Sequence, residues 1–75
     1  MLTRHLVTDD DIALLMLPDT EHGGPAVVAI VESYQMEAGF AGDYVALAHD
    51  LVSGEAEAWQ WFGDMKARRP WEVRQ

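Results

Sequence analysis

The chain has 75 residues, with 13 acidic against 5 basic side chains, a formal net charge of −8 and no cysteine. A chain this short has room for one domain with one modest core, and the lack of cysteine excludes disulfides and thiolate metal sites. The acidic balance disfavours direct binding to nucleic acid or to anionic membranes, because phosphate groups would repel it.

The first expected element is a helix that begins after Thr8 and ends before Pro18. Thr8 can cap it, and the aspartates of "TDDD" at residues 8–11 would favour the positive end of the helix dipole. The following stretch, "IALLML", is apolar on all sides, and Pro18 cannot continue a helix. A turn-rich break, "PDTEHGGP", follows at residues 18–25.

Three more helices are expected in the rest of the chain. The second begins at Pro25 and ends at Gly39, residues that suit the first helical position and the position just past the end. After a short connection, Asp43 can cap the third, which ends before "SG" at residues 53–54. The fourth runs from Glu55 to Arg68, with acids in its first turn and bases in its last.

These elements predict a mainly α protein, a small bundle of about four short helices. We expect a single domain over residues 1–75, with a flexible end at residues 70–75. The β-branched stretch "AVVAIV" leaves an α+β fold open, with a small antiparallel sheet from residues 2–7, 12–17 and 26–31. In the helical version, the core residues are Val27, Ile30, Val31, Tyr34, Leu47, Leu51, Phe62 and Met65.

The stretch "EAWQWFG" at residues 57–63 places large aromatic side chains on an arc of the fourth helix that is wider than a small bundle needs. The tryptophans lie at the two edges of that arc. We therefore expect Trp59 or Trp61 to be partly exposed and available to a partner, the alternative being that both belong to the core.

The charge is uneven along the chain, since residues 1–64 carry a net charge of −11 and residues 65–75 carry +3. A body of this sign would be steered toward basic surfaces, unless its acidity serves only solubility. The residues that we expect to contact a partner are Asp9, Asp10, Asp11, Asp43, Asp50, Glu55, Glu57, Trp59 and Trp61.

The chain contains no motif that predicts catalysis. The dipeptide "HD" at residues 49–50 carries almost no information alone. Asp19, Glu21 and His22 lie beside glycines in a polar stretch, which favours a solvated loop over a metal site. "HGGP" at residues 22–25 lacks the lysine and the further glycines of a phosphate-binding loop. We therefore expect no enzyme activity, no cofactor and no metal.

Two functions remain open, and they differ in the surface that binds. The first is a small acidic inhibitor or modulator that occupies a basic, nucleic-acid-binding surface of a larger complex. Phage-encoded anti-CRISPR and other anti-defence proteins act as nucleic-acid mimics in this way, an analogy of size and charge only. The second is a helical assembly subunit or adaptor that acts through apolar helix faces, with acidity only for solubility.

Two expectations apply to both functions. The apolar runs of the chain are far shorter than the roughly 20 residues that cross a bilayer, so we expect a cytoplasmic protein. The basic end of the chain is opposite in sign to the acidic body, so we expect a homodimer in which these parts of two copies pair.

Overall fold

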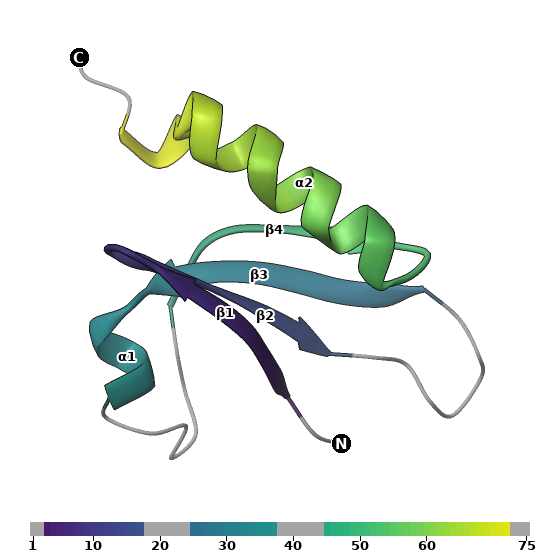
Figure 1. The fold of residues 1–75 in the computed structure, drawn as a ribbon, viewed down its shortest axis with the longest axis horizontal. Coiled ribbons are helices and arrows are strands. Elements are labelled where there is room, and N and C mark those ends of the chain that lie inside the picture. Colours follow the sequence, from purple (N-terminus) through teal and green to yellow (C-terminus); the bar gives the residue numbers. More distant parts are fainter. Residues whose placement is uncertain (1–2, 18–24, 38–44, 73–75) are drawn as a thin grey trace.

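The computed structural model describes residues 3–17, 25–37 and 45–72, which form an antiparallel sheet with one long helix across one of its faces (Figure 1). The strands are β1 (Arg4–Asp9), β2 (Ile12–Leu17), β3 (Ala26–Glu32) and β4 (Ala46–Val52), and they lie in the order β1-β2-β3-β4. The helical elements are α1 (Tyr34–Glu37), α2 (Glu55–Arg68) and the 3-10 helix η1 (Pro70–Glu72).

The expected helical bundle is wrong, because the fold is α+β. The stretch "IALLML" is β2 rather than a helix, and "AVVAIV" lies in β3. The sheet follows the α+β alternative, with strands close to the three ranges given for it, and adds β4 where we expected the third helix. The fourth expected helix is confirmed from Glu55 to Arg68.

The central strands are apolar at successive positions because both of their faces are buried. Leu14 and Leu15 point to opposite faces of the sheet, as neighbours in a strand must, and each is 0% exposed. Ala58 and Phe62 of α2 pack on the face of Leu14, and Met36 of α1 packs on the face of Leu15. A strand covered on both faces shows no alternation of polar and apolar residues, so its sequence resembles that of a buried helix.

Three of the eight expected core residues are exposed, namely Val27 at 37%, Leu51 at 59% and Tyr34 at 60%. Val27 and Leu51 are cross-strand partners in β3 and β4. Helical spacing had grouped them with the core, whereas strand pairing places them together at one side of the sheet. The other five are buried or partly buried against the core: Ile30, Val31, Leu47, Phe62 and Met65.

None of the helices in the described part of the chain is long and apolar enough to span a membrane.

Candidate functional site

Two ion pairs join α2 to β1. Arg4 Nη2 lies 2.8 Å from Glu55 Oε1, and Lys66 Nζ lies 2.7 Å from Asp9 Oδ2. From Arg4 to Asp9 a strand rises about 17 Å, and from Glu55 to Lys66 a helix also rises about 17 Å. The two elements therefore run in the same direction over equal lengths. The Arg4–Glu55 ion pair lies at one end of their contact and the Asp9–Lys66 ion pair at the other.

Trp59 lies on the line of α2 that joins Glu55 to Lys66. It is four residues after Glu55, and Lys66 is eleven residues after Glu55, spacings that return to the same side of a helix. Its side chain is 42% exposed, and its ring meets Phe62 edge-on with 6.5 Å between the ring centroids. Trp61 is partly buried and packs against the core. Of the tryptophans expected to meet a partner, Trp59 is therefore the one with an exposed ring.

β1, which lies under this side of α2, contains a β-bulge. The register with β2 shifts between His5 and Val7, which makes Leu6 an extra residue. Leu6 and Val7 are both partly buried and pack against the cluster under α2. The middle of β1 is therefore apolar on the helix side, between the ion pairs of Arg4 and Asp9.

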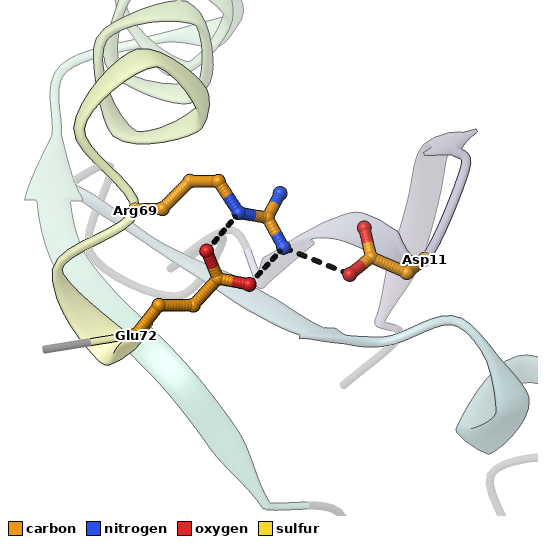
Figure 2. A network of polar contacts seen from close by, with 3 residues as sticks. All are labelled: Asp11, Arg69 and Glu72. Carbon is orange, nitrogen blue, oxygen red and sulfur yellow. Dashed lines mark hydrogen bonds and ion pairs between the residues drawn. The ribbon is translucent and has the colours of Figure 1, made fainter. Parts of the chain in front are cut away.

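Arg69 ends α2 and ties it to the loop between β1 and β2 (Figure 2). Its backbone is left-handed, with φ 42°, and its N–H donates to Met65 O at 2.7 Å. Its guanidinium donates to both carboxylate oxygens of Glu72 and to Asp11 Oδ2, each at 2.8 Å. Its carbon Cζ also lies 5.3 Å from the ring centroid of Trp71, which packs against the core.

The hydrogen bonds that the Arg69 guanidinium donates, first to Glu72 and then to Asp11, raise the pKa of Arg69 above its ordinary value. A raised pKa in the folded state gives a stabilisation that is complete below the unfolded pKa and is lost only as the pH rises through the folded value. Titration of the Arg69 guanidinium itself therefore has no effect on stability at any pH near neutrality.

We expect Arg69→Gly to be more stable than Arg69→Ala, although both lose the contacts with Asp11 and Glu72. Glycine adopts the left-handed backbone at a helix end without steric cost, whereas alanine does not. Urea denaturation of both variants measures the difference. A lower midpoint for Arg69→Gly would show that the left-handed geometry does not matter for ending α2.

The expected acidic contact residues fall into two groups at the two ends of α2. One group, Asp9 to Asp11, lies by the carboxyl end of α2, where Arg69 contacts Asp11. The other group lies by the amino end: Asp50 accepts the N–H of Leu51 at 2.7 Å, and Glu57 accepts the hydroxyl of Ser53 at 2.8 Å. A helix of this length separates the groups by about 21 Å. Asp43 is outside the described residues.

The described cations of the basic end are already paired within their own molecule. Lys66 contacts Asp9, Arg68 contacts Asp64 at 2.9 Å, and Arg69 contacts Asp11. The three cations thus have acidic partners in the same chain, and whether the basic end also meets a second copy stays a prediction.

The sheet also separates the histidine and aspartate of the "HD" dipeptide. His49 and Asp50 are successive residues of β4, so their side chains point to opposite faces. Within residues 3–17, 25–37 and 45–72, no three acidic or histidine side chains gather as a metal site would require. Asp19, Glu21 and His22 are outside the described residues.

No protein-family model, curated protein or solved structure matches the chain.

Proposed function

We propose that the protein is a non-enzymatic, cytoplasmic interaction protein that binds a basic, nucleic-acid-binding surface of a larger complex and thereby modulates that complex. The observation that supports this proposal is that the described cations are all in ion pairs within the chain. Each basic side chain that the structure describes has an acid of its own chain at 2.7 to 2.9 Å: Arg4, Lys66, Arg68 and Arg69. The described cations are therefore occupied, and none of them is left to offset the excess of acids that gives the chain its formal net charge of −8.

Of the acids whose side chains the structure describes, four have no ion pair, and they define the contact that we propose. Asp10 and Glu32 lie at one end, since the N–H of Ser33 donates to Asp11 O at 2.8 Å and so holds the end of β3 beside the β1–β2 loop. The partial negative charge at the carboxyl end of α2 adds to this end. Asp50 and Glu57 lie at the other end. A basic groove about 21 Å long would meet both ends together.

The adaptor alternative relied on exposed apolar helix faces. Ala58 and Phe62, the central apolar residues of α2, pack on the sheet instead. The described part of α2 thus leaves Trp59 as its exposed large apolar side chain. We therefore retain the acidic contact as the proposed mode of binding.

Capture of a partner from lysate of the source cell, on immobilised protein, tests the proposal. The amount of partner that stays bound should fall steeply as the salt concentration rises, because the proposed contact is made between exposed charges. Heparin or duplex DNA should also displace the protein, because they compete for the same basic surface. A partner that stays bound at high salt and in excess duplex DNA would contradict the proposal.

A further inference from the structure

β1 is an outer strand of the sheet, and the sheet faces to which its six side chains point follow a palindromic order. Arg4, Val7 and Asp9 pair with β2 residues that face α2, whereas His5 and Thr8 pair with residues of the opposite face. Because the bulge turns Leu6 to the helix side as well, the order of faces is the same when β1 is read from either end.

We propose that two copies of the chain pair along this outer edge, β1 antiparallel to β1, and form a continuous eight-stranded sheet. In the register that centres on Leu6 and Val7, each residue of β1 meets one from the same face. Arg4 lies opposite Asp9 of the second copy, His5 opposite Thr8, and Leu6 opposite Val7. The contact is isologous, as a twofold dimer requires.

Charge favours this register. Two molecules with a formal net charge of −8 each repel one another, so they can approach only where the surface is locally neutral. The edge of β1 is such a place, because Arg4 is paired with Glu55 and Asp9 with Lys66. Antiparallel pairing then adds an opposite charge across the seam at both of its ends, and opposite-charge cross-strand pairs stabilise a sheet.

Exposed apolar surface lies on the same side. Because α2 crosses one face of the sheet (Figure 1), a twofold axis perpendicular to the sheet places both copies of α2 on the same face. Trp59 of each copy then lies on the side of the seam, since it shares the line of α2 that contacts Arg4 and Asp9. The seam has an apolar centre, Leu6 and Val7, and charged residues at both of its ends. Binding interfaces usually have such an apolar core with a polar rim. Bulges usually turn edge strands away from neighbours, but this one lies at the midpoint, where it meets its own copy.

The opposite edge of the sheet is less suited to pairing. The backbone N–H of Leu51 in β4 already donates to the Asp50 carboxylate at 2.7 Å. Just before β4, the side-chain amide of Gln35 bonds both the N–H and the C=O of Val45, at 3.0 and 3.2 Å. Side chains thus occupy backbone groups at both ends of this strand, as they do where edge pairing is prevented.

Mixing two charge variants tests the register. Arg4→Glu places two acids opposite each other at both ends of the seam, and Asp9→Lys places two cations there, so each variant alone should dimerise at least about tenfold more weakly than the native chain. An equimolar mixture should recover dimers that contain one chain of each kind, because every cross-seam pair is then of opposite sign. Each variant turns one intrachain ion pair, with Glu55 or with Lys66, into a like-charge contact between partly exposed side chains, which costs little stability, so both are expected to fold.

Sedimentation velocity of the native chain and the mixture is the measurement, with circular dichroism to confirm folding. A native chain that stays at 8.4 kDa throughout the micromolar range would overturn the proposal, and so would a mixture that fails to recover dimers. The result is independent of the proposed function, since no other protein is present.

Trp59→Lys provides a second test, and Gln60→Lys is its matched control. Both residues are exposed on α2, but Gln60 is turned away from β1. We expect Trp59→Lys to raise the dissociation constant of the dimer by on the order of thirtyfold, and Gln60→Lys to leave it within about twofold. Equal effects of the two variants would show that Trp59 does not lie at the seam.

Discussion

Replacing Phe62 with alanine is expected to lower the free energy of unfolding by about 3–5 kcal/mol, the usual cost of removing a buried aromatic ring. Phe62 is 3% exposed and lies at the centre of the contact between α2 and the sheet. Its ring also meets the Trp59 ring in a T-shaped arrangement, and the centre of the Phe62 ring lies 5.1 Å from Lys66 Nζ. A domain of this size has a total stability of roughly 4–11 kcal/mol, so the variant should be close to unfolding.

Urea denaturation followed by circular dichroism measures this effect, with Gln60→Ala as the control. Gln60 is exposed on the opposite side of α2, so its replacement should change stability by no more than about 0.5 kcal/mol. A loss below about 1 kcal/mol in Phe62→Ala would contradict the packing of α2 on the sheet, because truncation of a packed aromatic ring costs several times more.

The helix α2 could be predicted from the sequence because its signals are local. Acids in the first turn and bases in the last, together with the break at residues 53–54, set its bounds, and they needed no knowledge of the rest of the fold. Its central apolar residues, Ala58 and Phe62, also follow from helical periodicity, and both are buried.

The strands were mistaken for helices because burial on both faces removes the alternation that identifies a strand. One local signal was nevertheless present in "TDDD". β1 ends at Asp9 and β2 begins at Ile12, so Asp10 and Asp11 are the two-residue loop of a hairpin. Asp10 has φ 57°, a left-handed backbone that aspartate tolerates better than most residues. The expected helix after Thr8 would instead place these aspartates in its first turn.

The sites could not be predicted because they depend on pairings between distant parts of the chain. The contact between Lys66 and Asp9 joins residues 57 positions apart, and that between Arg69 and Asp11 joins residues 58 positions apart. Whether a given acid is paired or free is decided by the register of the sheet and by the position of α2. Composition alone therefore overstated the free acidic surface around Asp9, Asp11 and Glu55.

Neutralising the free acids is expected to slow association with the captured basic partner by on the order of tenfold and to reduce its salt dependence. The variant combines Asp10→Asn, Asp50→Asn and Glu57→Gln. It should keep the fold, because asparagine also tolerates the left-handed backbone at position 10. The amide oxygens introduced at the other positions can still accept from the Leu51 N–H and from the Ser53 hydroxyl.

The matched control adds three positive charges along another line of α2: Ala56→Lys, Gly63→Lys and Ala67→Lys. These residues are exposed and share one line on the side of α2 that is turned away from the sheet. Both variants change the net charge by the same amount, so a difference between them reports where the charges lie rather than how many there are. Stopped-flow association at several salt concentrations provides the comparison. If both variants slow association equally, the partner responds only to net charge, and the two acidic ends of α2 are not its contact.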